Sequence, residues 1–391
     1  MRRMRMKALV ADGEWMPRAG YSPTGEETAR RRALIGSRVW RNTRFEVKDV
    51  AVPMLGGHDL LIKVKSCGIC GSDTHLYETD SEGYILFSGL TKLPCIVGHE
   101  FSGVIEAAGK AVTGFQKGDM AVFESIMWCG MCRQCRSGSP NQCGNIELLG
   151  LSSNGALAEY AVVNERYCWD ISSLKGVYPE DEAFDIGALI EPIGCAYNGI
   201  FVAGGGFNPG SSVVVYGSGP IGLGAVALSR TAGASLIIAF DVNDGRVRAA
   251  KEVGADFAFN LKTLDCKPSE KVMELTRGEG ADIQVEAAGA APETIPEMEK
   301  SLSSQGKIIY LGRAATKTEM YLDVLVSGAN KIVGARGHSG YGIFPFIIKL
   351  IASGRLKPEK MISSRYPFEK VIDALKASTG RETGKILVRM C

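Results

Sequence analysis

The pattern of hydrophobic and polar positions changes twice along this chain. From about residue 45 to 165, short β-branched and apolar runs are separated by Gly and Pro turns, which is typical of an irregular, mostly antiparallel β domain. These runs are 60–66, 103–107, 120–123 and 158–163. After residue 335 the pattern loosens again, and 385–389 indicates one more strand.

Between about 200 and 335 the pattern predicts strands alternating with helices. The candidate strands are 213–216, 236–240, 256–259, 283–286, 308–311 and 332–334, and 221–232 and 246–253 are helical stretches between them. Strands interleaved in this way form parallel sheets with both faces covered, so we expect an α/β fold.

Length supports two domains, because 391 residues can bury two separate cores. We expect a β-rich domain over 1–194, a parallel-sheet domain over 195–335, and a return of 336–391 to the first domain. The hydrophobic fraction of 45% and the charged fraction of 23% are typical of a globular protein.

Charge and cysteine content exclude several classes of protein. The net charge is only +2, from 45 Lys+Arg against 43 Asp+Glu, so we expect neither a nucleic-acid nor a membrane partner. The basic start reaches Asp12 too soon for a secretory signal, and the longest apolar stretch, 213–228, contains four glycines and Pro220. Eleven cysteines, an odd number, favour a reducing cytoplasm over a disulfide framework.

Four of these cysteines form a compact metal-ligand pattern, C-x2-C-x2-C-x7-C. They are Cys129, Cys132, Cys135 and Cys143. The spacing lets four thiolates converge on one tetrahedral Zn²⁺, and a site closed by four thiolates is structural. The alternative, a chance cluster of small apolar residues, is disfavoured because the intervening residues are polar.

A second motif predicts a dinucleotide site. The strand candidate 213–216 is followed by G-x-G-x-x-G with Pro220 and Ile221 inside it; its glycines are Gly217, Gly219 and Gly222. Directly after a strand and at the start of a helix, such glycines allow a tight turn, close approach to a pyrophosphate and close helix packing. The helix N-terminus then offers free N–H groups to the phosphates.

The next strand candidate ends at Asp241, which is 24 residues after Gly217. A carboxylate there accepts hydrogen bonds from ribose hydroxyls and repels a 2′-phosphate, so it favours NAD over NADP. Arg246 and Arg248 follow and leave NADP open. Asp241 has a simpler alternative role as a helix N-cap.

Two further motifs carry the residue types of a catalytic zinc site. Cys70 lies in 67–75, and His99 and Glu100 lie together further on. Cysteine, histidine and carboxylate ligate catalytic zinc, which keeps one position open. Taken singly, the three could be a small core residue, a core histidine and a surface charge. However, two of the chain's four histidines fall inside these motifs.

The order of these motifs resembles the zinc-dependent medium-chain alcohol and polyol dehydrogenases over roughly residues 45–391. The resemblance implies a GroES-like irregular β catalytic domain, a Rossmann doubly wound parallel-sheet domain, NAD and two zinc ions per chain. It implies that Cys70, His99 and Glu100 ligate the catalytic zinc. It also implies that Asp73 orients His99, and that Ser72 and His75 relay a proton.

The segment 188–192 resembles that of sorbitol- and threonine-dehydrogenase-like members. Glu191 would then be an exchangeable zinc ligand or would hold the metal-bound water. The spacing of Cys195 does not suit a ligand, and Cys67 is expected to pack into the core. The resemblance to the family favours a homo-oligomer, either a dimer or a tetramer. Arg246 is expected to lie beside the cofactor.

The chain departs from the family pattern at 13–44, 80–91 and 336–342. Polar residues in the last two segments suit a substrate with many hydroxyls, which we expect His338 to contact. Part of 80–91 with 337–340 looks like the scyllo-inosose (keto-inositol) dehydrogenases. We therefore expect a polyol or cyclitol substrate. The alternatives are a threonine-, butanediol- or sorbitol-type dehydrogenase, and a non-catalytic cofactor sensor.

Overall fold

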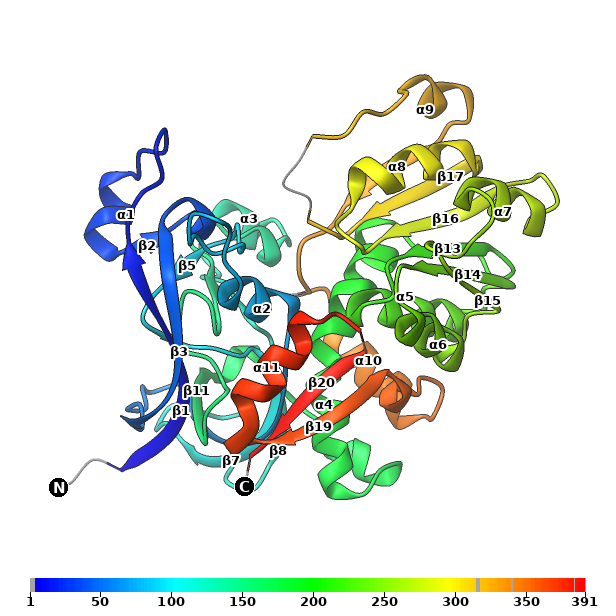
Figure 1. Ribbon diagram of the computed structural model, residues 1–391. Helices are drawn as coiled ribbons and strands as arrows, with labels where there is room; N and C mark the ends of the chain where they lie inside the picture. Colours follow the sequence, from blue (N-terminus) through cyan, green and yellow to red (C-terminus); the bar gives the residue numbers. More distant parts are fainter. Residues whose placement is uncertain (1–3, 314–316, 339, 383, 391) are drawn as a thin grey trace. The chain divides into compact units, whose positions relative to one another are not determined.

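The computed structural model describes residues 4–313, 317–338, 340–382 and 384–390, and these fall into two compact units (Figure 1). Unit 1 comprises Met1–Glu191, Ser364–Gly380 and Ile386–Cys391. Unit 2 comprises Pro192–Ser363 and Arg381–Lys385.

Unit 1 is built on a seven-stranded, mainly antiparallel sheet in the order β12-β8-β7-β4-β20-β19, with β11 also paired to β4. Its strands are β4 (Asp59–Gly68), β7 (Glu100–Ala108), β8 (Met120–Phe123), β11 (Tyr160–Asn164), β12 (Cys168–Asp170), β19 (Ile362–Pro367) and β20 (Lys385–Arg389). Each was expected from apolar runs except β12 and β19. Phe101 and Phe123 stack in the core with ring centroids 4.5 Å apart.

Smaller sheets complete unit 1. Strand β1 (Arg5–Trp15) pairs with β3 (Trp40–Ala51) and β6 (Cys95–Ile96). Strand β2 (Arg32–Ala33) pairs with β5 (Thr91–Lys92), and β9 (Ile126–Met127) pairs with β10 (Glu147–Leu148). The helices are α1 (Gly25–Arg30), α2 (Gly71–Tyr77), α3 (Arg133–Arg136), most of α4 (Glu180–Tyr197) and α11 (Val371–Thr379).

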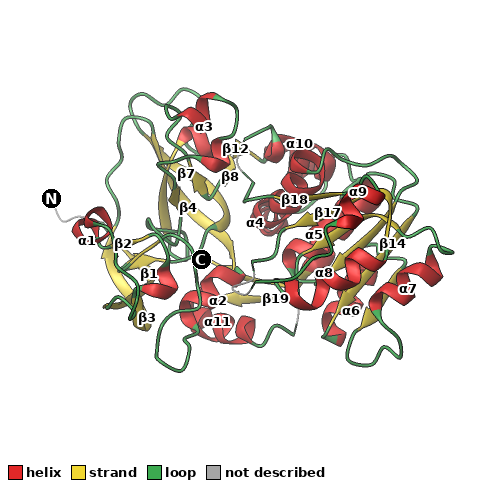
Figure 2. Ribbon diagram, turned by 90° about the horizontal axis from the view of Figure 1, so that it is seen from above, coloured by secondary structure: helices red, strands yellow, loops and turns green. Residues whose placement is uncertain are grey.

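Unit 2 contains the expected parallel sheet, six strands in the order β15-β14-β13-β16-β17-β18. The strands are β13 (Ser212–Tyr216), β14 (Leu236–Asp241), β15 (Phe257–Asn260), β16 (Ala281–Glu286), β17 (Leu302–Tyr310) and β18 (Lys331–Gly334). Figure 2 shows helices against these strands. The helices of unit 2 are α5 (Pro220–Thr231), α6 (Asp244–Val253), α7 (Pro268–Leu275), α8 (Ala291–Lys300), α9 (Asp323–Ser327) and α10 (Ile343–Ala352), and α5, α6 and α8 contact the sheet. This strand order is that of a Rossmann domain.

The expected boundaries at 194 and 335 differ from these units, because 336–363 belongs to unit 2. The Asn198 side-chain amide donates to the carbonyls of Arg336 and Gly337 at 3.1 and 2.8 Å. Tyr197 stacks with Phe346 of α10 at 6.2 Å between ring centroids. Apolar packing and these hydrogen bonds hold the segment, and only 364–380 and 386–391 return to unit 1.

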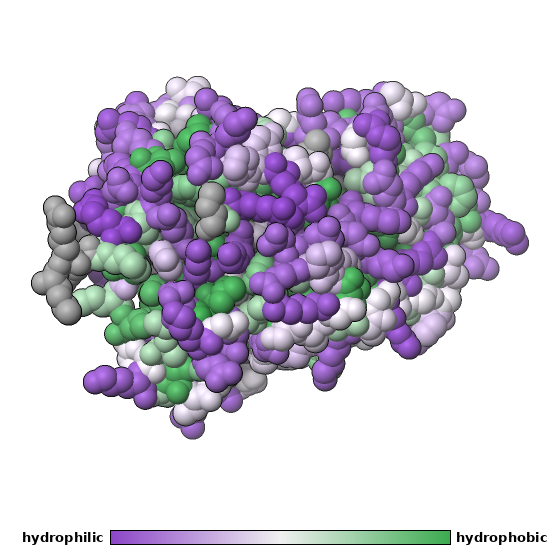
Figure 3. Space-filling view, turned by 90° about the horizontal axis from the view of Figure 1, so that it is seen from below, coloured by the Kyte–Doolittle hydropathy of each residue, from purple (hydrophilic) through white to green (hydrophobic). Residues whose placement is uncertain are grey.

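One helical stretch, Glu180–Ala203, is long and apolar enough to cross a membrane, but 72% of its window is buried inside the protein. Burial of this kind is typical of a core helix. The face seen in Figure 3 shows hydrophilic residues over most of its area, with hydrophobic residues in scattered places.

Helix α4 is anchored in unit 1 by one buried carboxylate. Asp185 is fully buried and accepts hydrogen bonds from Ser66 Oγ at 2.9 Å and from Arg365 Nε at 2.6 Å. Arg389 of β20 adds a second ion pair at 2.5 Å. Because a buried carboxylate is stable only when it is paired, these contacts fix α4 against the returning C-terminal strands.

We expect Asp185→Ala to lower the free energy of unfolding by about 2 kcal/mol, because it leaves two arginines without their partner. The partly exposed arginines make this cost smaller than for a fully buried pair. Urea denaturation measures it, and Glu180→Ala at the exposed start of α4 is the control. Equal stability of both variants would contradict the anchoring role of Asp185.

Candidate active site and metal centres

Pairing of β4 with β7 brings the two reactive motifs together. Gly68 at the end of β4 lies opposite Glu100 at the start of β7. Two residues beyond Gly68, Cys70 is the N-cap of α2. Gly98 has φ +87°, and a Cβ there would lie 2.6 Å from Leu157 Cγ, so only glycine fits this approach to His99.

The three expected ligands of a catalytic zinc converge. One ligand atom each of Cys70, His99 and Glu100 lies within 4.8 Å of the others, a spacing that one metal ion can bridge. Glu100 is buried, so it is not the surface charge of the simpler interpretation, and His99 is buried beside it. Burial lowers the pKa of His99, but the negative charges of Asp73 and Cys70 outweigh it and raise that pKa well above its usual value. The site therefore attracts a cation.

Asp73 joins the two motifs and is completely buried. Its Oδ2 accepts the Cys70 N–H at 2.9 Å, and its Oδ1 accepts the Gly98 N–H at 3.2 Å. Oδ1 also lies 3.7 Å from Nδ1 of His99. Asp73 therefore holds the backbone on both sides of the cluster and faces the histidine ring, as an orienting residue would.

The other expected residues of this site lie in the same unit. Ser72 Oγ is 3.3 Å from His99 Nε2, and His75 follows one turn later on α2. Glu191 is buried and its Oε1 accepts a hydrogen bond from Ser125 Oγ at 2.8 Å. Glu191 lies outside the three-residue ligand group, although its charge also contributes to the raised pKa of His99. Cys67 is fully buried, as expected.

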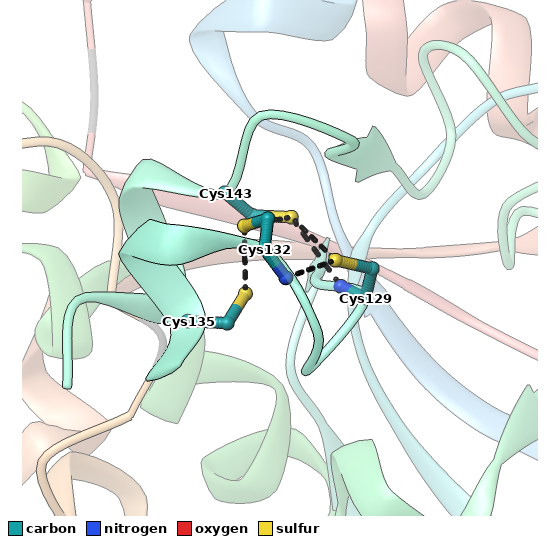
Figure 4. Close-up of side chains that lie close together, drawn as sticks. All are labelled: Cys129, Cys132, Cys135 and Cys143. Atoms are coloured by element: carbon teal, nitrogen blue, oxygen red, sulfur yellow. Dashed lines mark hydrogen bonds between the residues drawn. The ribbon is translucent and has the colours of Figure 1, made fainter. Parts of the chain in front are cut away.

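The four-cysteine lobe forms a second candidate metal centre (Figure 4). The Sγ atom of Cys132 lies 3.5 Å from that of Cys135 and 3.8 Å from that of Cys143, and Cys143 Sγ lies 3.6 Å from Cys129 Sγ. These thiols are not joined by disulfides. Four sulfur ligands pointing to one centre fit a structural zinc ion.

Backbone hydrogen bonds to Cys129 favour the thiolate form of its side chain. The N–H groups of Met131 and Cys132 donate to Cys129 Sγ, each at 3.4 Å. They lower the pKa of Cys129 to about 6. Burial instead raises the pKa of Cys135 to about 12, so a bound cation is needed to hold all four sulfurs as thiolates.

The glycine motif has the geometry of a dinucleotide site. Gly217 has φ +89°, and a Cβ there would lie 2.6 Å from the Ala288 nitrogen. A Cβ on Gly222 would lie 1.8 Å from the Gly217 carbonyl oxygen. Gly219, the N-cap of α5, instead has open space, since its nearest neighbour is Arg246 at 3.9 Å. Pro220 and Ile221 begin α5, and because Pro220 has no N–H, the backbone donors at this helix start come from the residues that follow it.

Asp241 lies at the end of β14 and accepts three backbone N–H groups. Ser218 donates to Oδ2 at 2.7 Å, and Val242 and Asn243 donate to Oδ1. The N-cap of α6 is Asn243, so the interpretation of Asp241 as the helix cap is wrong. Arg246 Nη1 lies 3.9 Å from Asp241 Oδ2. Burial lowers the pKa of Arg246, and nearby Arg381 lowers it further.

Sequence reasoning missed Ser125 and Arg381, because neither lies in a motif. Ser125 follows β8 and reaches Glu191 only in the folded unit, and Arg381 returns to unit 2 from the C-terminal segment. The expectation that His338 contacts substrate is also not supported. His338 is fully buried, with its ring 4.9 Å from Phe344, and Ser339 lies outside the described residues.

Two family models match the chain: the alcohol dehydrogenase GroES-like domain over residues 56–173 and the zinc-binding dehydrogenase over 220–353. Scyllo-inosose 3-dehydrogenase of Thermotoga maritima is 38% identical, covering 98% of this chain and 99% of its own length. L-threonine 3-dehydrogenase of Symbiobacterium thermophilum is 32% identical, covering 88% of this chain and 93% of its own.

Solved structures agree with these matches. A candidate alcohol dehydrogenase from Thermotoga maritima superposes with a TM-score of 0.94 at 37% identity, covering 98% of this chain and all of its own. A candidate zinc-binding dehydrogenase of Sinorhizobium meliloti 1021 bound to NADP has a TM-score of 0.78 at 26% identity, over 99% and 100% of the chains. An E. coli CFT073 alcohol dehydrogenase complexed with NADH has the same score and identity, over 98% and 99%.

The chain therefore belongs to the zinc-dependent medium-chain alcohol dehydrogenase family. It is an oxidoreductase that uses a nicotinamide cofactor and acts on a small-molecule alcohol.

The two cysteine-containing clusters predict different effects of losing one sulfur. Metal analysis by mass spectrometry should find two zinc ions per chain, and one in either Cys132→Ser or Cys70→Ser. We expect Cys132→Ser to lose stability and soluble yield, because the lobe is held by its metal. Cys70→Ser should keep its fold and lose turnover. Activity near the wild-type level in Cys70→Ser would contradict the catalytic site.

Proposed function

We propose that this protein is an NAD-dependent zinc dehydrogenase that oxidises a secondary hydroxyl of a polyol or cyclitol, of the inositol or scyllo-inosose type, to a ketone. The observation that carries this proposal is the length of the match to the scyllo-inosose 3-dehydrogenase. That relative aligns with 98% of this chain and the threonine dehydrogenase with 88%. The match to the cyclitol enzyme therefore extends over more of this chain, which supports a substrate of its class.

Cys70, His99 and Glu100 would hold the catalytic zinc, with Glu191 as an exchangeable ligand or as the acceptor for its water. A Zn²⁺ ion held by these residues would act as a Lewis acid and lower the pKa of a substrate hydroxyl. Asp73 fixes the orientation of His99 by facing Nδ1, which leaves Nε2 on the side of Ser72. The donor set, one thiolate, one imidazole and one carboxylate, suits zinc.

The alcohol proton leaves through this chain's own hydroxyl and imidazole groups. Ser72 Oγ lies 3.3 Å from His99 Nε2, beside the candidate metal ligands, where its hydroxyl would accept the alcohol proton while passing its own onward. His75, one turn further along α2, is half-buried and can pass the proton to water. Both groups are on one helix, so their spacing is fixed.

NAD supplies the hydride acceptor when it is bound. Gly217, Gly219 and Gly222 give the pyrophosphate its space, and the first turn of α5 gives it N–H donors. Asp241 uses three of its roughly four acceptor positions inside the protein, which leaves room for a ribose hydroxyl. Cys129, Cys132, Cys135 and Cys143 would hold the structural zinc.

The second candidate function is a threonine-, butanediol- or sorbitol-type dehydrogenase, favoured by the threonine dehydrogenase match. For either candidate function, we also propose that the protein is cytoplasmic and forms a homo-oligomer, either a dimer or a tetramer. The edge strand β18 and neighbouring α9 leave Ile332, Leu322 and Val326 exposed, which suits contact with a second copy.

Cofactor preference tests the role of Asp241. We expect kcat/KM with NAD to exceed that with NADP by at least about tenfold, or about 1.4 kcal/mol, because the carboxylate repels a 2′-phosphate. Asp241→Asn should reduce this ratio, whereas Asp244→Asn, on the exposed start of α6, should not. Equal kinetics with NADP in the wild type would point to Arg246 as a phosphate-binding residue.

A substrate panel tests the cyclitol proposal. Inositols, inososes and linear polyols are compared with threonine, 2,3-butanediol and ethanol by following NADH absorbance. A site that hydrogen-bonds several hydroxyls rejects analogues without them, so we expect the best cyclitol to exceed ethanol by about a hundredfold or more in kcat/KM. Threonine or butanediol as the best substrate would select the second candidate instead.

A further inference from the structure

The insertion between β1 and β3, residues 16–39, forms an ordered arm with helix α1 (Figure 1). We propose that Arg18 of this arm is a positioning residue for the active site. It holds the segment 80–87 in the conformation that caps the C-terminal end of α2, the helix that carries Ser72 and His75. The kinetic part of this inference rests on the proposed function, and the structural part does not.

Arg18 makes three contacts with one short segment. Its guanidinium forms an ion pair with Asp80, and its Nη1 lies 3.1 Å from Glu82 Oε2. The guanidinium carbon is also 4.1 Å from the centre of the Tyr84 ring, a cation–π distance. Arg41 of β3 faces the same ring at 5.7 Å. With only 24% of the Arg18 side chain exposed, these contacts are better shielded than an ordinary surface pair.

Asp80 is the residue that closes the 80–84 turn. Its Oδ1 accepts the N–H groups of Glu82 and Tyr84, both at 3.0 Å, and its own N–H donates to the Tyr84 carbonyl at 2.8 Å. One oxygen of Asp80 thus organises the turn while the other meets Arg18. Removing Arg18 would leave this carboxylate without its cation and the Tyr84 ring with only the more distant Arg41.

The residues that follow the 80–84 turn contact α2 directly. The N–H groups of Leu86 and Phe87 both donate to the carbonyl of His75, at 2.9 and 3.0 Å. Carbonyls in the last turn of a helix lack partners within the helix, so an outside donor fixes that end. Thr43 Oγ of β3 donates to the next carbonyl, that of Leu76, at 2.9 Å.

The arm also reaches the four-cysteine lobe. Arg32 of β2 lies 3.1 Å from Glu147 Oε1 and donates to the carbonyl of Ile146 at 2.5 Å. Leu90, just before β5, packs in one apolar cluster with Ile146 and Cys143. The arm therefore connects the lobe with the segment that caps α2.

Hydrogen exchange tests the structural part without any substrate. In Arg18→Ala, we expect the Leu86 and Phe87 amides, resolved by fragmentation mass spectrometry, to exchange about fivefold to thirtyfold faster. The matched control is Arg30→Ala, an exposed arginine of α1 that pairs with Glu26 one turn earlier. Exchange in the control, and at β13 in unit 2 of both variants, should stay unchanged.

Steady-state kinetics test the positioning role. With the best alcohol of the panel, Arg18→Ala should lower kcat about threefold to tenfold and leave KM for NAD unchanged, because only the proton-relay helix moves. Arg18→Lys keeps the charge and should recover part of both effects. If Arg18→Ala unfolds, Asp80→Asn takes its place in both measurements.

Unchanged exchange at Leu86 and Phe87 would overturn the inference, as would faster exchange with an unchanged kcat. A lower kcat accompanied by an equal rise of KM for NAD would also overturn it, since that result indicates a general loss of structure. If no alcohol is oxidised by the wild type, the proposed function fails, while the exchange result still decides whether Arg18 holds the cap of α2.

Discussion

The active site depends on the antiparallel pairing of β4 and β7, locked by the buried carboxylate of Asp73. The pairing brings the end of one strand opposite the start of the other, so residues thirty positions apart become neighbours. Asp73 then accepts an N–H from each side, at Cys70 and at Gly98. Because Asp73 is completely buried, its negative charge needs these donors and the facing imidazole of His99. The same group that joins the two strand ends therefore also faces the candidate ligand His99.

Several of the strands and the glycine motif could be predicted because they depend on local rules. Strand β8 was expected at 120–123 and β20 at 385–389, as found, since short apolar runs between turn residues have few alternatives. Each glycine of the cofactor motif is required for a steric reason. Gly217 has a positive φ, Gly219 borders open space, and a Cβ on Gly222 would lie 1.8 Å from the Gly217 carbonyl oxygen. Local requirements of this kind are visible in a single sequence.

Features that depend on contacts distant in sequence could not be predicted. The segment 336–363 belongs to unit 2 because Asn198 binds its backbone and Tyr197 stacks on Phe346, and no pattern in the sequence marks these partners. His338 follows a strand of the nucleotide domain, which suggested a ligand contact, but its ring is enclosed against Phe344. The sequence position of His338 indicates which strand it follows, but it does not indicate where its side chain points.

The arm at 16–39 shows how a surface insertion can affect chemistry without touching the substrate. A helix of seven residues such as α2 has little stability of its own, because short helices are marginal without tertiary contacts. Its start is held by Asp73, and its end receives donors from Leu86 and Phe87. Any group that orders those donors also orders Ser72 and His75 on the helix between the two ends. In the inference proposed above, Arg18 orders them through the turn at Asp80, so a residue far in sequence from the candidate metal ligands would position the two proposed proton-relay residues.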